Sequence, residues 1–232
     1  EIRFHHRAKR ITPILSRILL VSLDRLLKYI NLLIAAVAVA ALAAVYWFAW
    51  RPLPKTGGEL KAPVSAPVTV MRDSLGMPHI RAADIEDALF AQGFVTAQDR
   101  LWQMDALRRR AAGELSEVAG EAALESDREV RRLRMARIAR EQAARLTPED
   151  RQALSAYARG VNYYIETSQG RLPLEFSLMR YDPRPWSVAD SVLAALEMFR
   201  TLTSSWKTEI QKQALLGGGD RAKIEFLYPV RS

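Results

Sequence analysis

The pattern of apolar and polar positions divides the 232-residue chain into a segment that suits a membrane and a longer segment that suits a folded domain. Residues 32–50 are an apolar run without a single charged side chain. A helix of that length extends for about 28 Å, close to the hydrocarbon thickness of a bilayer. Arg51 and Pro52 follow directly and would end such a helix. The pattern therefore predicts one transmembrane helix over residues 32–50.

A cleaved signal peptide is the alternative interpretation of this run, because its alanines could supply a peptidase site. We favour an uncleaved anchor, since Tyr46, Trp47 and Trp50 place bulky rings where a membrane meets water. Residues 1–31 before it form a basic segment. Within that segment, apolar residues recur at helical spacing over residues 11–28. They predict an amphipathic helix on the inner leaflet or, alternatively, a cytoplasmic helix that packs on a partner.

The net charge of +8 is distributed unevenly along the chain. Residues 1–51 contain eight Lys and Arg and two acidic residues, a net +6, whereas the remainder has 26 basic and 24 acidic residues, only +2. Basic charge beside an apolar run indicates a membrane surface rather than DNA or RNA. By the positive-inside rule, we expect the N-terminus in the cytoplasm and the main domain outside. The sequence has no Cys, which excludes disulfides and thiolate nucleophiles.

Residues 51–67 contain four prolines and two glycines, which predicts an extended linker. A strand over Val68–Arg72, a turn at residues 73–76 and a second strand near His79 and Ile80 should follow as a hairpin. The rest of residues 68–232 has mainly helical patterns. We therefore predict a mainly α chain with one short strand pair, whose hairpin needs further strands from elsewhere.

Local signals mark the beginnings and ends of the helices. Asp84 and Thr147 are expected N-caps, and Ser187 with Asp190 predicts a capping box that starts a last helix running to about residue 216. Gly93 is expected to interrupt its helix. The arginine-rich residues 127–146 predict one helix that faces solvent or a partner, with an anion site as the alternative.

Few side chains suggest catalysis. Of three histidines, only His79 lies outside the membrane and its basic flank, so a Ser-His-Asp triad could use no other, and a histidine metal site lacks the usual ligand set. We assign His79 a structural role in its strand. Asp99, Arg100, Asp105 and Arg108 are the other charged candidates, and the i, i+3 spacing of Asp105 and Arg108 allows them to pair with each other.

The order of residues from Val70 to Gly120 is specific: VMRDSLGMPHI, a spacer, and then FAQGFVTAQDRLWQMDALRRRAAGELSEVAG. It resembles the start of the α-subunit of the penicillin acylase family, which are N-terminal-nucleophile (Ntn) hydrolases of amides. The resemblance extends from about Val68 to Leu227. It implies that residues 68–232 are an α-subunit domain, part of a four-layer αββα fold that a separate β-subunit completes. It also implies that the helix region is scaffold, so we interpret Asp99, Arg100, Asp105 and Arg108 as ion pairs that seat the chain against its partner.

The last predicted helix, aligned through Trp186 and its Glu-Ile…Ala-Leu-Leu ending, resembles the family helix that lines the acyl pocket and then reaches a calcium ion. The alignment places the calcium-binding carboxylate on Glu209, with most other calcium ligands coming from the β-subunit. It places the pocket wall on four residues, namely Met198, Phe199, Leu202 and Thr203. Leu202 stands where penicillin G acylases carry Arg, which favours an aliphatic acyl chain such as that of an acyl-homoserine lactone.

In the mechanism that the resemblance implies, a precursor cleaves itself and frees an N-terminal Ser on the β-subunit, which attacks the amide. Ser232 is the last residue here and is not such a nucleophile, so we expect no catalytic residue in this chain. The leading hypothesis is the α-subunit of a periplasmic amidohydrolase, anchored by one span in the bacterial inner membrane. A catalytically silent anchor or accessory subunit is the alternative, and a binding module would have to fold alone.

Overall fold

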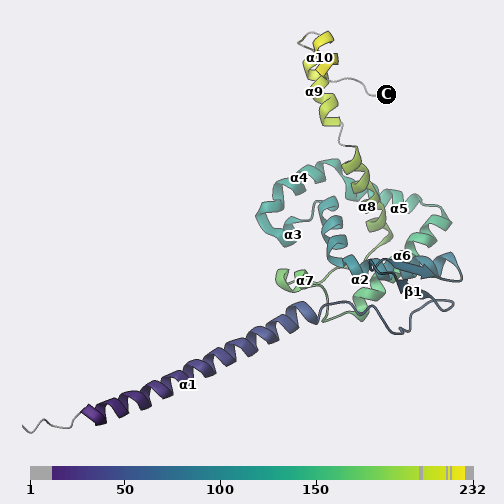
Figure 1. The fold of residues 1–232 in the computed structure, drawn as a ribbon. Coiled ribbons are helices and arrows are strands. Elements are labelled where there is room, and N and C mark those ends of the chain that lie inside the picture. Colours follow the sequence, from purple (N-terminus) through teal and green to yellow (C-terminus); the bar gives the residue numbers. More distant parts are fainter. Residues whose placement is uncertain (1–11, 204–205, 218, 220, 228–232) are drawn as a thin grey trace, which may run out of the picture. The chain divides into compact units, whose positions relative to one another are not determined.

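The computed structural model describes residues 12–203, 206–217, 219 and 221–227, and the chain falls into two units, residues 1–53 and 54–232 (Figure 1). The first unit contains the helix α1, Thr12–Val45, which continues as a π-helical segment, η1, over Tyr46–Trp50. The apolar run and the stretch before it thus form one helix, because α1 has no break between them. The predicted amphipathic segment is therefore not a separate element.

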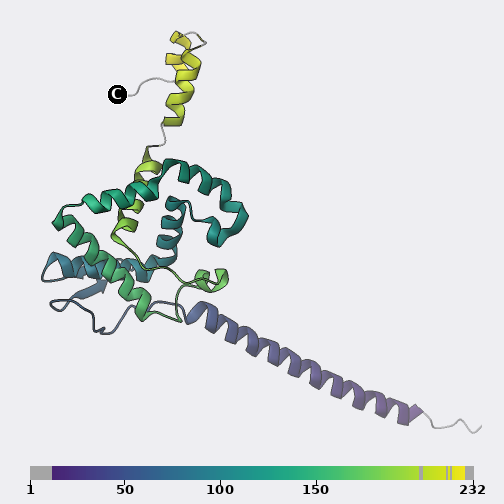
Figure 2. The same cartoon turned by 180° about the vertical axis from the view of Figure 1, so that it is seen from behind.

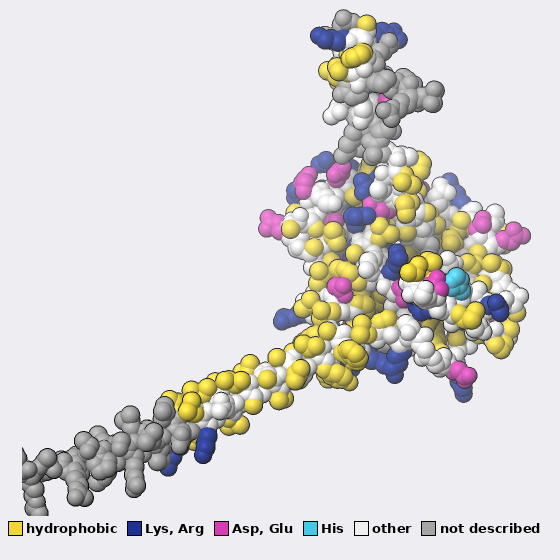
Figure 3. Space-filling model, viewed as in Figure 1, with side chains coloured by type: hydrophobic (Ala, Val, Ile, Leu, Met, Phe, Trp, Pro, Cys, Tyr) yellow, Lys and Arg dark blue, Asp and Glu magenta, His cyan; other side chains and the backbone are white. Residues whose placement is uncertain are grey.

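Residues 25–50 are long and apolar enough to cross a membrane, with an 18-residue stretch of mean hydropathy 2.4 and no buried residue, although a signal sequence would pass the same test. Figure 3 shows apolar side chains covering this helix, with Lys and Arg gathered toward its N-terminal side. At its other end the Arg51 guanidinium lies 4.3 Å from the centre of the Trp47 ring. This cation–π contact lies where the apolar stretch ends.

The first strands of the second unit form the predicted hairpin. Strands β1, Thr69–Arg72, and β2, Pro78–Arg81, pair antiparallel, with Val70 opposite Ile80. The turn between them closes because one Asp73 carboxylate oxygen accepts hydrogen bonds from the backbone N–H groups of Leu75 and Met77, both at 2.9 Å. Within the described residues these two strands form the only sheet, so the prediction of a mainly helical chain with one strand pair is confirmed.

Two long helices, α2 over Ile85–Ala112 and α6 over Pro148–Thr167, cross at the centre of the second unit (Figures 1 and 2). A Cβ atom at Gly93 of α2 would overlap the backbone carbonyl of Tyr157, and one at Gly160 of α6 would overlap that of Phe90. The prediction that Gly93 interrupts its helix is therefore wrong. Glycine is needed there because the two backbones approach so closely. The actual irregularity lies at Arg100, with φ −144° and ψ 23°.

The arginine-rich stretch forms two helices instead of the one predicted. After α3, Ser116–Ala119, and the 3₁₀ turn η2, Gly120–Ala123, come α4, Leu124–Leu133, and α5, Met135–Arg145. Arg134 between them has a left-handed backbone with φ 54°. The break lets buried side chains of both helices, Val130 and Met135 among them, pack in one apolar cluster while most arginines face solvent.

The C-terminal helices are α7, Leu174–Met179; α8, Val188–Leu202; α9, Trp206–Leu216; and α10, Arg221–Leu227. The predicted single helix from Ser187 to about Leu216 is therefore wrong. Thr203 leaves helical geometry, with φ −101° and ψ 41°, and ends α8. The sequence interpretation also did not anticipate α10, which lies beyond the glycine run.

The proline-rich segment before the hairpin is extended but is bound to the helices. The Asp87 carboxylate of α2 accepts hydrogen bonds from the backbone N–H groups of Ser65 and Ala66, each at 3.0 Å. Gln98 donates to the carbonyl of Lys55 at 2.9 Å, and the Tyr163 hydroxyl of α6 donates to the carbonyl of Lys61. This part of the linker therefore follows the surface of the helical domain.

Candidate functional site

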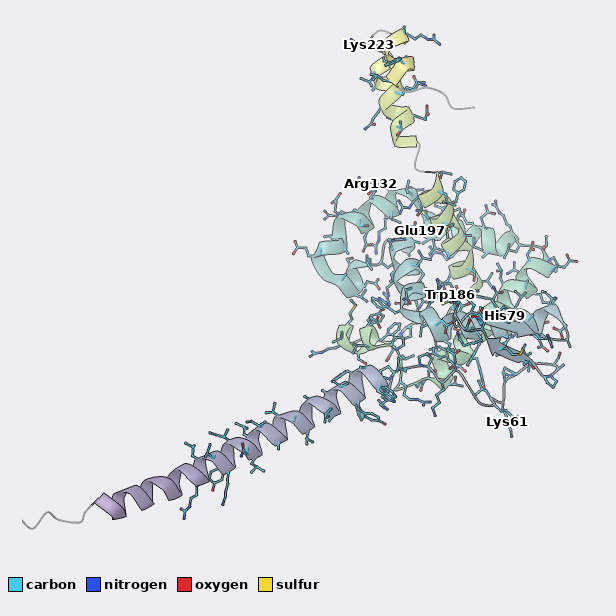
Figure 4. The ribbon with its side chains drawn as sticks, in the orientation of Figure 1. Lys61, His79, Arg132, Trp186, Glu197 and Lys223 are labelled. Atoms are coloured by element: carbon cyan, nitrogen blue, oxygen red, sulfur yellow. The ribbon has the colours of Figure 1, made fainter. Side chains whose placement is uncertain are left out.

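The start of α8 is fixed by its own capping box and by α6. The Ser187 side chain accepts a hydrogen bond from the backbone N–H of Asp190, and the Asp190 carboxylate accepts one from the backbone N–H of Ser187 at 2.8 Å. Asn162 of α6 makes two hydrogen bonds to the backbone of Trp186, at 2.6 and 2.9 Å. Trp186, labelled in Figure 4, also donates from its indole nitrogen to the Ser191 hydroxyl at 2.9 Å. The first turn of α8 is thus held from two sides.

A buried charge network connects this start to α2. The side chains of Asp105 and Arg108 are each 1% exposed and bond at 2.8 Å through the Arg108 Nε. The two terminal nitrogens of Arg108 donate to the carbonyls of Arg184 and Pro185, at 2.6 and 3.2 Å. These are the residues that lead the chain into α8. Arg108 therefore fixes the segment that leads into α8, since its guanidinium presents several donors in a rigid, planar fork.

The second oxygen of Asp105 accepts hydrogen bonds from Arg109 Nε at 2.8 Å and from the Tyr181 hydroxyl at 2.7 Å. Burial acts to raise the pKa of Asp105, but the charge of Arg108 and the hydrogen bonds outweigh it, so that pKa lies below its usual value. Asp105 and Arg108 do pair, as their spacing allows. The expectation that they seat the chain against a partner is wrong, because both are buried within the chain.

Asp99 and Arg100 lie outside this network. Asp99 binds Arg72 of β1 at 2.8 Å, which joins the hairpin to α2, and therefore also serves an interaction within the chain. The Arg100 side chain is exposed at the irregular point of α2. His79 (Figure 4) is exposed in β2, where its Nε2 lies 3.3 Å from Asp73. The contacts of Asp99 and His79 therefore stabilise the hairpin, and the Asp99 contact also joins it to α2.

Glu197 forms a second buried charged group, further along α8 (Figure 4). It is 1% exposed and accepts hydrogen bonds from Arg200 Nε and Nη2, both at 2.8 Å, while the Nε of Arg110 on α2 lies 3.1 Å away. Hydrogen bonding from Arg200 is the main reason that the pKa of Glu197 lies below its usual value. Glu197 is also the last buried residue of α8.

The four predicted pocket residues come directly after Glu197 and share one surface. Met198, Phe199 and Leu202 are 60%, 66% and 75% exposed, and Thr203 is exposed as well. The Thr203 hydroxyl donates to the carbonyl of Phe199 at 2.7 Å, which helps to end the helix. The structure thus brings these four side chains together on an open surface. The described residues do not enclose them in a cavity.

A groove of about 350 Å³ lies elsewhere, between β2 and α2. Its lining includes Ile80, Ile85 and Leu89, with Gln92 and Thr96 as its polar side chains, and none of the lining residues is titratable. It lacks the groups that acid–base chemistry needs.

Glu209 lies exposed in the first turn of α9, after residues 204 and 205, which the structure does not describe. Among the described residues there is no group of three or more His, Cys, Asp or Glu that could hold a metal ion. Calcium takes six to eight oxygen ligands, and one carboxylate supplies at most two. A calcium ion at Glu209 therefore needs most of its ligands from outside these residues.

Comparisons with known proteins identify relatives of the helical domain. The family model for penicillin amidase matches residues 67–231. The chain belongs to the penicillin amidase family. It is 41% identical to penicillin acylase 2 proenzyme of Pseudomonas sp. (strain SE83) over 66% of this chain and 20% of that protein. It is 36% identical to the acyl-homoserine lactone acylase QuiP of Pseudomonas aeruginosa (strain PAO1) over 70% of this chain and 19% of that protein.

A solved chain of this amidase family, from thermostable penicillin G acylase of Alcaligenes faecalis, matches with a TM-score of 0.59 and 28% identity. The match covers 72% of this chain and 93% of the solved chain. By contrast, the chain spans only about a fifth of the length of the curated relatives that it matches. The solved chain is thus similar in length to the matched part of this chain, whereas the two curated relatives are about five times as long as the part that they share with it.

Sequence reasoning missed most of the residues that hold α8 in place, namely Arg109, Arg110, Asn162, Tyr181 and Glu197. One signal was present for Glu197, which is an acid inside the apolar run VLAALEMF. An acid at such a position needs a cation close by, because burying it alone is costly. The sequence does not show that Arg110 of α2 supplies one.

Proposed function

We propose that this chain is the α-subunit of a membrane-anchored, periplasmic amidohydrolase, which hydrolyses a linear amide with the N-terminal Ser of a separate β-subunit. The observation that carries the proposal is the penicillin amidase match over residues 67–231. The near-complete coverage of one solved penicillin G acylase chain supports the two-subunit arrangement. The exposed hairpin and the exposed end of α8 are surfaces that a β-subunit would cover as the four-layer αββα fold is completed.

The α-subunit would supply one wall of the acyl pocket. Met198, Phe199 and Leu202 present a mainly apolar surface at the end of α8, with Thr203 beside them. Leu202 gives this wall no charge with which to recognise a polar acyl group. An aliphatic acyl chain, as in an acyl-homoserine lactone, is therefore the substrate that the wall suits best.

The reaction needs groups that the α-subunit does not supply. An N-terminal Ser hydroxyl attacks the carbonyl carbon of the amide, and the α-amine of the same Ser accepts its proton and passes it to the leaving amine. Water then hydrolyses the acyl ester and frees the acid. In this arrangement, the α-subunit binds the acyl chain and the β-subunit catalyses the cleavage of the amide.

Calcium is proposed as a structural ion, with Glu209 as its ligand from this chain. A carboxylate in the first turn of α9 is chemically suitable, and the β-subunit would provide the remaining oxygens. Removing calcium with EGTA should lower the thermal unfolding midpoint of the full enzyme. Glu209→Gln should reproduce that loss and remove the response to EGTA, whereas an unchanged response in the variant would contradict the assignment.

The inner-membrane location rests on the apolar helix at residues 25–50 and on the basic residues that precede it. A single span with a cytoplasmic N-terminus would place the helical domain in the periplasm. In intact spheroplasts, added protease should then digest the domain. Survival of the domain until the membrane is dissolved would contradict this orientation.

Substrate profiling tests the proposed activity. The full enzyme would be assayed on a homologous series of N-acyl amides, including acyl-homoserine lactones and penicillin G. We expect kcat/KM to rise as the aliphatic acyl chain lengthens. A preference for short polar acids would contradict the pocket assignment. Failure to cleave any amide would favour the alternative, a catalytically silent homologue that anchors or assists a membrane complex.

A further inference from the structure

We propose that Glu197, bound by Arg110 of α2, is a positioning residue that fixes the rotation of the last turn of α8 and thereby sets acyl-chain selectivity. The selectivity part rests on the proposed function. The positioning part rests only on the contacts of α8 with the rest of the helical domain.

Glu197 is the last buried side chain of α8 and the last that a side chain of α2 contacts. Leu193 belongs to the apolar cluster with α2, α4 and α5, and Leu196 packs against that cluster. After Glu197 no residue of α8 is buried. The final turn therefore takes its orientation from the Glu197 contact rather than from apolar packing of its own.

The two cation partners of Glu197 have different consequences. Arg200 lies on the same helix, three residues on, so its hydrogen bonds to Glu197 stiffen the turn, and outside α8 its guanidinium is attracted to the charge of Glu129 on α4. Arg110 comes from α2, three residues before Gly113, where α2 ends in a left-handed cap. Its 3.1 Å contact therefore ties the end of α8 to a fixed position on another helix.

Helical geometry places the proposed pocket residues on the face of α8 opposite Glu197. Successive residues are rotated by about 100° around a helix axis. Measured from Glu197, Met198 lies at about 100°, Leu202 at about 140°, Phe199 at about 200° and Thr203 at about 240°. Their mean direction is about 170°, almost opposite Glu197. Any rotation of this turn about the Glu197 contact would move all four side chains across the pocket wall together.

A charged contact suits this position, because the apolar side chains of the last turn are exposed and none of them is buried against the domain. Glu197 is 1% exposed, whereas Arg110 remains half exposed and Arg200 about one-third exposed. Removing Arg110 would leave Glu197 with only its own helix as partner. The last turn should then rotate or fray more freely, and its pocket side chains would no longer present one fixed wall.

The test uses the full two-subunit enzyme and the same series of N-acyl amides. Arg110→Met keeps most of the side-chain stem but removes the charge, and Glu197→Gln keeps the shape of the acid. The control is Glu125→Gln, because Glu125 also pairs with an Arg three residues on, Arg128, but at 3.5 Å on an exposed surface. Arg110→Lys, which retains a cation, should behave between wild type and Arg110→Met.

We expect Arg110→Met and Glu197→Gln to change the kcat/KM ratio between the longest and shortest acyl chains by about tenfold, since small misplacements of binding groups are costly. Glu125→Gln should leave the ratio unchanged. A purely structural role would lower the active fraction equally for every substrate. An unchanged ratio in both variants would therefore overturn the selectivity claim.

Hydrogen exchange separates this proposal from the proposed activity. Backbone amides of residues 198–203 should exchange faster in Arg110→Met than in wild type, and at the wild-type rate in Glu125→Gln. Unchanged exchange would overturn the positioning role, whatever the kinetics. If the wild-type enzyme cleaves no amide, the proposed function and the selectivity claim fail together, while the exchange rates still decide the positioning claim.

Discussion

At the scale of single residues, the buried ion pair of Asp105 and Arg108 does most to organise the candidate site. Both side chains are 1% exposed, and Arg108 also binds the carbonyls of Arg184 and Pro185 that lead into α8. The sequence predicted that the two residues pair, because i, i+3 spacing on a helix fixes their separation. It did not predict their burial, since burial depends on the distant loop at Tyr181 that covers them.

Asp105→Asn should lower the free energy of unfolding by about 3 kcal/mol, because it leaves Arg108 and Arg109 without their shared buried carboxylate. The measurement is urea unfolding of the full enzyme, followed by tryptophan fluorescence. Glu141→Gln is the control: Glu141 also pairs with an arginine of its own helix, Arg137 at 2.7 Å, but both side chains are exposed. The control should change stability by less than about 1 kcal/mol. Equal effects of the two substitutions would contradict the role of the buried pair.

The same carboxylate predicts a dependence on pH. The pKa of Asp105 is lowered in the folded chain despite burial, through Arg108 and the hydrogen bonds of Tyr181 and Arg109. Its stabilisation is therefore present above the pKa of an unfolded Asp, about 3.9, and is lost as the pH falls through the lower folded value. The stability difference between wild type and Asp105→Asn should remain constant from pH 7 to about pH 5 and shrink below about pH 4. A difference that persists undiminished at pH 2 would count against this assignment.

At the scale of elements, the sequence predicted what short-range chemistry decides. The caps at Asp84, Thr147 and Ser187 and the turn at Asp73 were all predicted correctly, because each depends on a side chain that bonds to backbone within a few residues. The breaks at residues 134 and 203 were missed. Arg134 adopts φ 54° so that Val130 and Met135 can pack in one cluster, and no local residue pattern encodes that requirement.

The role of Gly93 also depends on packing that no local residue pattern encodes. A glycine within a helix predicts an interruption from local propensity, yet here it permits α2 and α6 to cross in close contact. Of the proposed pocket, i, i+4 spacing correctly put Phe199 and Thr203 on one face. The Glu197 contact behind that face depends on an arginine 87 positions earlier in the chain, at Arg110.

Gly160→Ala should destabilise the helix crossing by about 2 kcal/mol or more, because the added methyl group overlaps the backbone carbonyl of Phe90, which cannot move aside as a side chain could. Gly57→Ala is the control, since nothing lies within 4 Å of the Cβ position there. Thermal unfolding of both variants measures the effect. A Gly160→Ala enzyme as stable as the control would show that the helices do not approach so closely.

At the scale of the whole molecule, the chain combines a long apolar helix with a helical domain of the penicillin amidase family. The described residues contain one two-stranded sheet and present an exposed apolar end of α8, with Met198, Phe199 and Leu202 all more than half exposed. Under the proposed function, a second polypeptide would complete the sheet and cover the exposed end of α8. The family relatives, of which this chain spans about a fifth, have ample length for such a partner.

The most direct test of this account is the N-terminal residue of the polypeptide that co-purifies with the helical domain when the full gene is expressed. We predict a separate chain that begins with Ser, produced by self-cleavage of a precursor. Substituting that Ser by Ala in the precursor should abolish both cleavage and amide hydrolysis. An uncut precursor, or a partner that begins with a residue lacking a nucleophilic side chain, would contradict the account and favour a silent anchor or accessory subunit.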